Sequence, residues 1–594
     1  MNTQLYQKMV KASLSVLLVV AVFAGSINLP ATTAASATTQ IQVWSFGVIS
    51  DTQWTVADDG FNPNTMAANA ITQIDQQFVK AGVKFVIAVG DTVDVGSAAN
   101  IGARALYAQQ LYNAGIGFYP LRGNHEAAET PPDLTSGAEM LHAFPQIGTG
   151  VNNNTPSDIT TALITPTADL ANNPPAARTG VTFTVGTNFT EPTAVNTANN
   201  SVSYAFQYGN ATFMLLDQFD VTGNYYNSTI PNQQDWISTT LASRPANTHA
   251  FVFAHKNLLG GNHKDNLFGG PVVSSDPGDG SGVVTATLTI TQLNQLTAKQ
   301  AAENNFVATM QANKVDYVIT GHDHHHYVSL VTSPDGNSKV RQIIGQSDSS
   351  KYYTPVTPFS SNDTPVQQDL FKVGYYIYTI DGPRVTVDYY ADAIGTNGTY
   401  GGKFNFVKVS SLHYSLNGKE KFVAQKGSYV MTDDTTAAAA LEPGFKGTVM
   451  NIVAGTNNGI AMTNYGKAVV NDVTTAWQTS TSSFLYSDIL SLNGMADALG
   501  GVNTDPFVLS LTYTGTLPVN SGIMTRNANG VWINVAERSF GAVPQFISGP
   551  WQPTYTKVGT YGIDPATHTA WAVLNITGDF VVGTYGVFLP MVLK

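Results

Sequence analysis

The stretch VDYVITGHDHHH, residues 315–326, joins an apolar run to four histidines. Its β-branched and aromatic start predicts a buried strand that ends at Gly321. His322 and His324 are two residues apart, and on an extended segment such residues point to the same side. Two imidazoles directed at one point indicate a metal site, because imidazole is a common ligand of zinc and other transition metals. A solvated histidine-rich loop is the alternative.

Earlier apolar runs also end in polar residues. The predicted elements are strands at 41–50, 83–89 and 116–121, with helices at 65–80 and 98–113 between them. This alternation predicts parallel strands joined by right-handed crossovers. Ligands bind at the carboxyl ends of strands in such sheets, where this chain has Asp51, Asp91 and Asn124. Taken singly, each of these residues has helix capping as its alternative role.

Residues 201–390 contain further predicted strands and helices. A hairpin is predicted at 201–217, helices at 233–242 and 298–312, a strand at 250–254 that ends at His255, and strands at 340–345, 375–380 and 385–390. Nine of the eleven histidines lie between residues 125 and 326, which favours one site over scattered packing roles.

Composition limits the possible functions. The chain has 594 residues, enough for two or three domains, and 43% of them are apolar, which suits large cores. Only 11% are charged, and the net charge of −12 argues against a binder of nucleic-acid polymers. The chain has no cysteine, so disulfides, thiolate ligands and a cysteine nucleophile are excluded.

The N-terminus predicts export. Lys8 and Lys11 precede the apolar run 14–23, and Ala35-Ser36-Ala37 fits a signal-peptidase site. We therefore expect a signal peptide at 1–37, with a retained membrane anchor as the alternative, and a secreted protein that is extracellular, periplasmic or at the cell surface. We expect no transmembrane segment in the mature protein.

The order of motifs suggests a family. The motifs are Asp51-x-Gln53, Gly90-Asp91-x-x-Asp94, Gly123-Asn124-His125-Glu126, His255 and Gly321-His322-x-His324. Together they resemble the motifs of the calcineurin-like metallophosphoesterases, over roughly residues 43–390. The resemblance implies a layered α/β/β/α domain, here placed at 41–395, that hydrolyses small phosphate esters. Phosphate diesters, monoesters and nucleotide pyrophosphates are all possible substrates.

The resemblance also implies a two-metal site with a metal-bridging hydroxide. Asp91 matches the bridging ligand. Asp51 and His324 match ligands of one ion, and Asn124, His255 and His322 match ligands of the other. His125 matches a histidine near the leaving group, which acts as a general acid or stabilises the transition state. Asp94 and Glu126 are expected to orient imidazoles.

Three positions bear on which metal ions and substrates the site would bind. Gln53 stands where the family usually has histidine, which favours Mn²⁺ slightly over Zn²⁺ or Fe²⁺ and hints at diesters or pyrophosphates. Asp94 stands where purple acid phosphatases have tyrosine, so an Fe³⁺–phenolate centre is not expected. Lys256 is expected to be solvated, with a contact to a substrate phosphate as the alternative.

The remaining segments carry no recognised chemistry. Residues 127–200 are predicted to be a long polar insertion, and 395–402 a linker. Short apolar runs between turn residues predict a β-rich, sandwich-like domain at 403–594. That domain is a candidate for binding a surface, a glycan or a partner. A non-catalytic cell-surface binding protein that keeps the phosphoesterase fold is the alternative function.

Overall fold

The computed structural model describes most of the chain between residues 43 and 392 and parts of the region that follows. The described residues are 43–54, 66–127, 136–152, 183–192, 202–219, 227–349, 351–353, 355, 360–382, 384–392, 403–416, 419–424, 430–431, 449–452, 466–472, 486–487, 489–493, 503–513, 515–527, 531–576 and 578–585. The predicted signal peptide, the predicted linker and most of the predicted insertion lie outside them.

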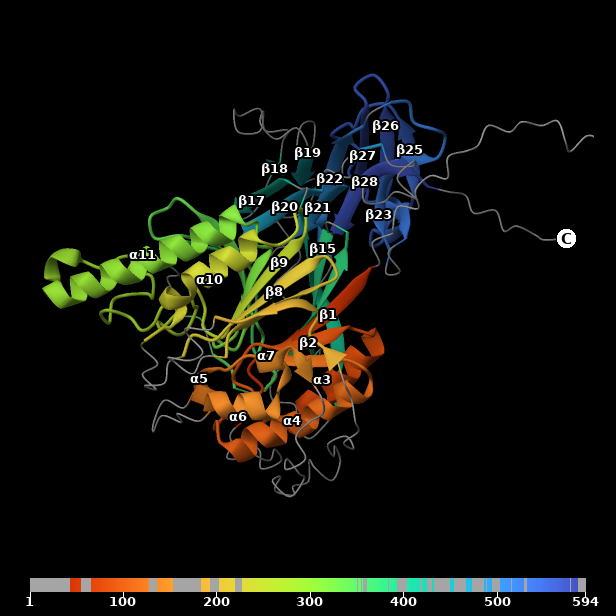
Figure 1. Ribbon diagram of the computed structural model, residues 1–594. Helices are drawn as coiled ribbons and strands as arrows, with labels where there is room; N and C mark the ends of the chain where they lie inside the picture. Colours follow the sequence, from red (N-terminus) through yellow and green to blue (C-terminus); the bar gives the residue numbers. More distant parts are fainter. Residues whose placement is uncertain are drawn as a thin grey trace, which may run out of the picture. The chain divides into compact units, whose positions relative to one another are not determined.

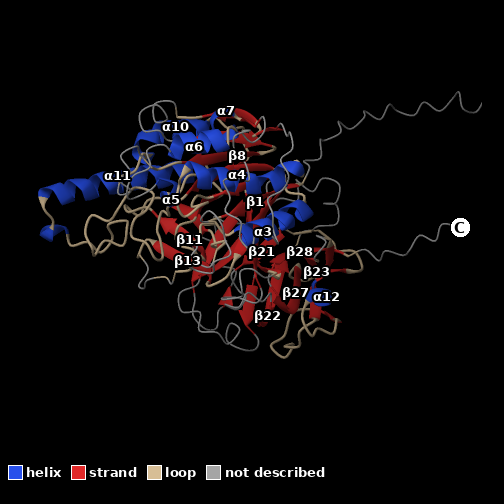
Figure 2. Cartoon of the chain, turned by 90° about the horizontal axis from the view of Figure 1, so that it is seen from below, coloured by secondary structure: helices blue, strands red, loops and turns tan. Residues whose placement is uncertain are grey.

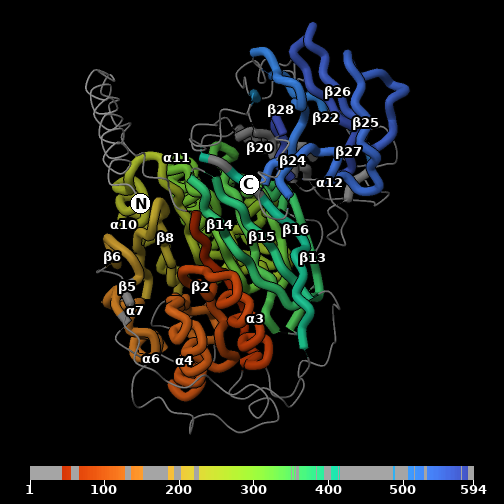
Figure 3. The backbone as a smooth tube through the Cα atoms, turned by 90° about the vertical axis from the view of Figure 1, so that its right-hand side faces the viewer, coloured from red at the N-terminus to blue at the C-terminus, as the bar shows by residue number. Residues whose placement is uncertain are grey.

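The first sheet contains the strands that the N-terminal apolar runs predict. Its order is β16-β15-β14-β1-β2-β3. The strands span Trp44–Ile49 (β1), Phe85–Ala88 (β2), Gly117–Pro120 (β3), Gly374–Asp381 (β14), Arg384–Asp392 (β15) and Phe406–Ser415 (β16). β1, β2 and β3 are parallel and are connected by α3 (Ala68–Ala81) and α4 (Ala98–Asn113). β14 pairs antiparallel with β1, so segments far apart in the sequence lie side by side (Figure 3).

The second sheet has the order β13-β11-β12-β10-β9-β8-β7-β6. Its strands span Thr187–Thr190 (β6), Tyr204–Tyr208 (β7), Ala211–Leu216 (β8), His249–Ala254 (β9), Tyr317–Thr320 (β10), His326–Thr332 (β11), Lys339–Ile344 (β12) and Asp363–Asp369 (β13). β8, β9, β10 and β12 are parallel neighbours. α10 (Ile230–Ala242) lies between β8 and β9, and a 3-10 turn (Thr285–Thr287) followed by α11 (Ile290–Ala312) lies between β9 and β10.

Aromatic side chains form the core between the two sheets. Phe46 of β1 packs edge-on against Phe213 of β8 and Phe251 of β9, with ring centroids 5.0 and 5.3 Å apart. α3 and α4 cover the outer face of the first sheet, and α10 and α11 cover that of the second (Figure 1). The layers are therefore α/β/β/α, as the fold class predicts.

The described parts of the insertion pack beside β3. After α5 (Asn124–Ala127), which precedes the insertion, they include α6 (Ser136–Ala143), α7 (Gln146–Thr149), β4 (Val151–Asn152) and β5 (Phe183–Thr184). Gln146 Nε2 donates to the carbonyl oxygen of Phe118 at 2.6 Å and to the hydroxyl of Tyr112 at 3.0 Å. These bonds hold α7 against β3 and α4.

The C-terminal region is strand-rich, as predicted, and its one described helix is the short α12 (Figure 2). Two sheets have the orders β17-β20-β21-β28-β23-β24 and β18-β19-β22-β27-β26-β25. The elements span Lys419–Ala424 (β17), Val430–Met431 (β18), Val449–Ile452 (β19), Gly466–Asp472 (β20), Ile489–Asn493 (β21), Asn503–Thr512 (β22), Ser521–Arg526 (β23), Trp532–Asn534 (β24), Val535–Arg538 (α12), Gln545–Ser548 (β25), Thr560–Asp564 (β26), Thr569–Ile576 (β27) and Gly578–Thr584 (β28). Leu509, Ile523 and Phe580 come from both sheets and share one core.

Two elements differ from the sequence interpretation. β16 lies in the range assigned to the C-terminal domain, yet it pairs with β15 of the first sheet. α11 begins at Ile290, eight residues before the predicted start at 298, because Thr289 and Gln292 form a capping box at its N-terminus. None of the helices in the described residues has the length and apolar composition of a membrane span.

Candidate metal centre

The predicted site residues lie in loops at the carboxyl ends of parallel strands. In the first sheet, Asp51 follows β1, Asp91 follows β2, and Asn124 begins α5 after β3. In the second sheet, His255 follows β9, and His322 and His324 lie between β10 and β11. Both sheets therefore contribute side chains to one place.

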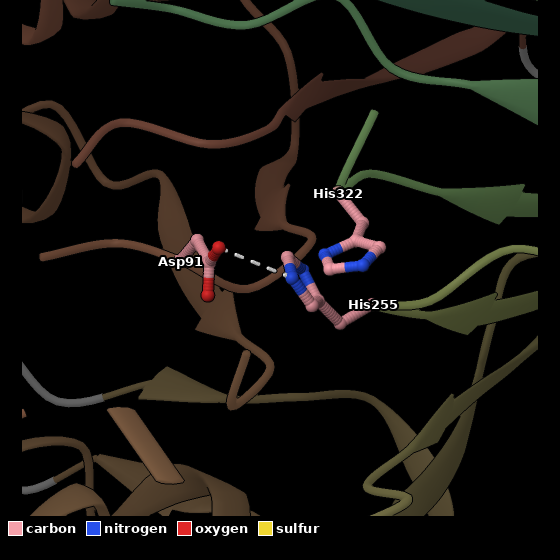
Figure 4. A group of neighbouring side chains, drawn as sticks. All are labelled: Asp91, His255 and His322. Carbon is pink, nitrogen blue, oxygen red and sulfur yellow. Dashed lines mark ion pairs between the residues drawn. The ribbon is translucent and has the colours of Figure 1, made fainter. Parts of the chain in front are cut away.

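Asp91 is common to two groups of candidate metal ligands. One group contains Asp91, His255 and His322, and the other contains Asp51, Asp91 and His324; within each group the ligand atoms lie within 4.8 Å of one another. All five side chains are buried. Figure 4 shows Asp91 and His255 directed toward each other, with 3.2 Å between Asp91 Oδ2 and His255 Nε2, and the ring of His322 beside that of His255.

Four of these five residues have a left-handed backbone. Their φ angles are 51° at Asp51, 49° at Asp91, 71° at His322 and 56° at His324. Residues with side chains rarely adopt this conformation, and such strain gathers at functional sites. The interpretation of His322 and His324 as part of an extended segment is therefore wrong, although both imidazoles do reach the cluster.

Hydrogen bonds to main-chain carbonyls orient two of the imidazoles. His255 Nδ1 lies 2.9 Å from the oxygen of Val89, and His324 Nδ1 lies 2.6 Å from the oxygen of Lys351. With Nδ1–H donating to the carbonyl in each case, Nε2 is the nitrogen left for a metal. His324 Nε2 lies 3.3 Å from Asp51 Oδ1.

Two amide side chains extend the ligand set. Asn124 Oδ1 lies 2.9 Å from His255 Nε2, so Asn124 belongs with the His255 group. Gln53 Nε2 lies 3.2 Å from Asp91 Oδ2 and 3.1 Å from His324 Nε2, between two members of the other group. Gln53 Oε1 is buried and has no hydrogen-bond partner within the described part of the chain.

Mutual attraction tunes the ionisation of the cluster. Burial raises the pKa of Asp91, but the neighbouring His255 and His125 more than offset it and hold this pKa well below its usual range. Burial lowers the pKa of His255, and Asp91 outweighs that effect, raising the pKa to about 9. Burial and the nearby His263 lower the pKa of His322 to about 4, so its imidazole is neutral at pH 7, the form that binds metals.

His125 lies at the accessible side of the cluster, where its side chain is 26% exposed. Its Nε2 lies 3.9 Å from Asp91 Oδ2, and its Nδ1 lies 2.8 Å from the main-chain oxygen of Asp94. The Asp94 carboxylate also lies 3.3 Å from His125 Nδ1. Asp94 thus contacts an imidazole, as the resemblance implies.

Glu126 has a different role from the one the resemblance suggests. Its buried carboxylate accepts hydrogen bonds from the main-chain N–H groups of Asp91, Val93 and Gly123 and from the hydroxyl of Thr92. No hydrogen bond or ion pair links it to an imidazole in the described residues. Glu126 therefore holds the loops after β2 and β3 together.

The segment after β9 adds charged and polar side chains beside the candidate ligands. Lys256 is fully buried and its Nζ lies 2.6 Å from Asp265 Oδ2, so the expectation of a solvated lysine is wrong. Asp265 is also 3.5 Å from His322 Nε2. His263 Nδ1 lies 2.7 Å from Asp323 Oδ1, and its ring centroid is 4.1 Å from that of His322.

The other histidines divide into buried and exposed ones. His325 and His326 are buried, and His326 stacks on Tyr389 with centroids 4.2 Å apart. His249 is buried against Asp316 at 3.2 Å. His142 and His568 are exposed, and the side chain of His413 lies outside the described residues.

Several solved structures are similar to this chain at low sequence identity. No curated protein matches the chain. Similar solved structures include purple acid phosphatase PPD1 from yellow lupin seeds (14% identity, 63% of this chain and 54% of that chain, TM-score 0.36), GAP50, the anchor in the inner membrane complex of Plasmodium (12%, 62% and 88%, 0.33), and a dimetal phosphatase from Danio rerio (14%, 61% and 98%, 0.30). The chain thus spans about half of the lupin protein.

The family assignment rests on a separate match. The model of the calcineurin-like phosphoesterase family matches residues 45–326, the range that holds every predicted site residue. Residues 45–326 of this chain are a calcineurin-like phosphoesterase domain.

Proposed function

We propose that this protein is an exported, metal-dependent phosphoesterase that hydrolyses small phosphate esters at a two-metal site. The observation that carries the proposal is the position of Asp91, whose carboxylate belongs to both groups of candidate ligands. A carboxylate shared by two ligand groups can hold two ions close together.

The residues fit two divalent ions. Asp51, Asp91, His324 and the amide of Gln53 would hold one ion, and Asp91, Asn124, His255 and His322 would hold the other. A half-turn of the Gln53 amide would direct Oε1, which is buried and unpartnered among the described residues, at this ion in place of Nε2, and a metal would then satisfy it. Mixed carboxylate, amide and imidazole ligands suit Mn²⁺, Zn²⁺ or Fe²⁺, and the amide of Gln53 favours Mn²⁺ slightly.

Bound divalent ions lower the pKa of a water molecule and neutralise the charge on a phosphoryl group. The protein supplies the geometry and a proton. His125 stands on the accessible side, and although burial lowers its pKa, Asp91 raises it above the usual value. A protonated His125 can donate from Nε2 to a leaving oxygen, because Nδ1 donates to the Asp94 carbonyl.

The remaining parts of the proposal rest on the sequence. Export is inferred from the basic, apolar and small-residue order of residues 1–37. The acidic net charge of −12 favours small esters over nucleic-acid polymers. The role of the C-terminal region as a binding module for a surface, a glycan or a partner is proposed on its separate β-rich core.

The test is hydrolysis of p-nitrophenyl phosphate and bis-p-nitrophenyl phosphate with Mn²⁺, Zn²⁺ or Fe²⁺ supplied separately. We expect Asp91→Asn to lower kcat/KM at least about a thousand-fold, because metal ions supply several kcal/mol of transition-state stabilisation. The bound metal content should fall as well, whereas the exposed-site control Asp235→Asn should keep both. No turnover with any metal, together with at most one bound ion, would favour a non-catalytic binding protein.

A further inference from the structure

The segment Lys351–Tyr353, which joins β12 to β13, lies against the candidate metal centre. The main-chain oxygen of Lys351 accepts the hydrogen bond from His324 Nδ1 at 2.6 Å. The ring of Tyr353 lies 4.7 Å from that of His324 and 4.9 Å from that of His263, measured between centroids. The hydrogen bond to His324 therefore fixes the main chain of this segment relative to a candidate ligand. The Cα positions of Lys351 and Tyr353 are fixed with it.

The ammonium group of Lys351 lies on the accessible side of the centre. Its Nζ is 3.3 Å from Asp94 Oδ1 and 3.4 Å from His125 Nε2. The side chains of Lys351 and His125 are each 26% exposed, and that of Asp94 is 15% exposed, whereas the candidate ligands are buried. Lys351 therefore places a positive charge on the exposed side of the buried ligands.

The ammonium group of Lys351 keeps an N–H donor for a substrate oxygen. An ammonium group has three N–H donors. Asp94 accepts from one of them, and His125 Nε2 accepts from a second only when it is unprotonated, so at least one donor is left for a substrate oxygen. Lys256, by contrast, is fully buried and its ammonium is committed to Asp265.

We propose that Lys351 is a substrate-binding residue that contacts an ionised oxygen of the phosphoryl group and favours groups with two ionised oxygens. Such a group is the phosphate of a monoester or the terminal phosphate of a longer phosphate chain, whereas a diester carries one ionised oxygen. A positive charge beyond the metal ligands attracts the doubly charged group more strongly. This inference rests on the proposed phosphoesterase function and narrows its substrate class.

The first test compares Lys351→Gln with the wild type on p-nitrophenyl phosphate, inorganic pyrophosphate and bis-p-nitrophenyl phosphate. Loss of a charge-assisted hydrogen bond should lower kcat/KM for the doubly charged substrates about ten-fold more than for the diester. Lys351→Arg should keep most of the preference. The matched control is Lys372→Gln, since Lys372 is 20% exposed and pairs with Asp369 at 3.0 Å. Comparison of p-nitrophenyl phosphate with pyrophosphate shows whether the doubly ionised group comes from a monoester or from a phosphate chain.

A second test needs no variant. Inorganic phosphate should inhibit the wild-type enzyme at a concentration about ten-fold lower than dimethyl phosphate does, since only the former can carry two charges. Equal inhibition by the two anions, or equal losses on all three substrates in a Lys351→Gln protein that keeps its metal content, would overturn the inference. Absence of any turnover by the metal-loaded wild type would instead reject the proposed function.

Discussion

Gln53 would give the two proposed metal positions unequal ligands. Its amide lies between Asp91 and His324, with Nε2 at 3.2 and 3.1 Å from them. The amide oxygen and nitrogen exchange places by a half-turn of the amide group, which would direct Oε1 at the same two partners. An amide oxygen is a weaker and harder ligand than imidazole, so the ion held by Gln53 should be the more weakly bound of the two.

Replacement of Gln53 tests this directly. We expect Gln53→Ala to lower the affinity of one of two Mn²⁺ binding sites about ten-fold or more. The affinity of the other site should be nearly unchanged, because only one ligand group loses a member. Gln53→His should tighten the weaker site and shift its preference from Mn²⁺ toward Zn²⁺. Equilibrium dialysis with Mn²⁺ and Zn²⁺ measures both effects. Two unaltered Mn²⁺ affinities in Gln53→Ala would show that Gln53 is not a ligand.

For individual residues, the sequence predicts which side chains belong to the candidate metal centre, but it does not predict their contacts. Strand-end motifs place Asp51, Asp91 and His255 at the carboxyl ends of strands, and the structure brings these ends together from two sheets. Lys351 was not found because it follows a polar run with no periodicity or spacing that marks a site. Lys256 was misjudged because its partner Asp265 is nine residues away, on a loop whose path the sequence does not define.

At the scale of elements, Glu126 links the loops that follow β2 and β3. Its four hydrogen bonds hold the main chain at Asp91 and Gly123. The close approach of the loops also requires a glycine at 123, since a Cβ there would clash with the Asp91 carboxylate. The position of the shared ligand Asp91 therefore depends on a residue that binds no metal in the proposed scheme.

Loss of this link should affect both stability and metal binding. We expect Glu126→Ala to lower the free energy of unfolding by about 3 kcal/mol, because buried N–H donors lose their acceptor. The same variant should bind less metal, since Asp91 and Asn124 lose their fixed separation. Urea unfolding and metal analysis measure the two effects, with the exposed Glu537→Ala as control. Normal metal content in a destabilised Glu126→Ala would limit Glu126 to a structural role.

The sequence predicts the bounds of a buried helix more accurately than those of an exposed helix turn. α4 is predicted at 98–113 and is found at Ala98–Asn113, where nearly every residue from 101 to 112 is buried. α11 extends eight residues further toward its N-terminus than predicted, because that part projects outward and Ile290 is 74% exposed. Apolar periodicity reports burial, so a helix turn that packs against nothing leaves no such signal.

At the scale of the whole molecule, the first sheet and the C-terminal sheets meet at ion pairs that composition did not reveal. Asp579 of β28 pairs with Arg384 at the start of β15 and lies 3.4 Å from Nε of Arg526 at the end of β23. Arg526 in turn reaches Asp381 at 3.9 Å. Asp579 and Arg384 are each only 3% exposed, so the charges depend on each other for neutralisation.

Asp579→Asn removes the charge that Arg384 and Arg526 share while keeping the size of the side chain. We expect the free energy of unfolding to fall by about 3 kcal/mol, because breaking a buried pair leaves an uncompensated charge. Because Asp579 joins strands of both parts, calorimetry should also show the two parts unfolding at more widely separated temperatures than in the wild type. Asp235→Asn, at an exposed position on α10, is the control and should change stability by no more than about 0.5 kcal/mol. If Asp579→Asn behaves like this control, the ion pairs do not couple the phosphoesterase domain to the C-terminal sheets, and apolar contacts must hold them instead.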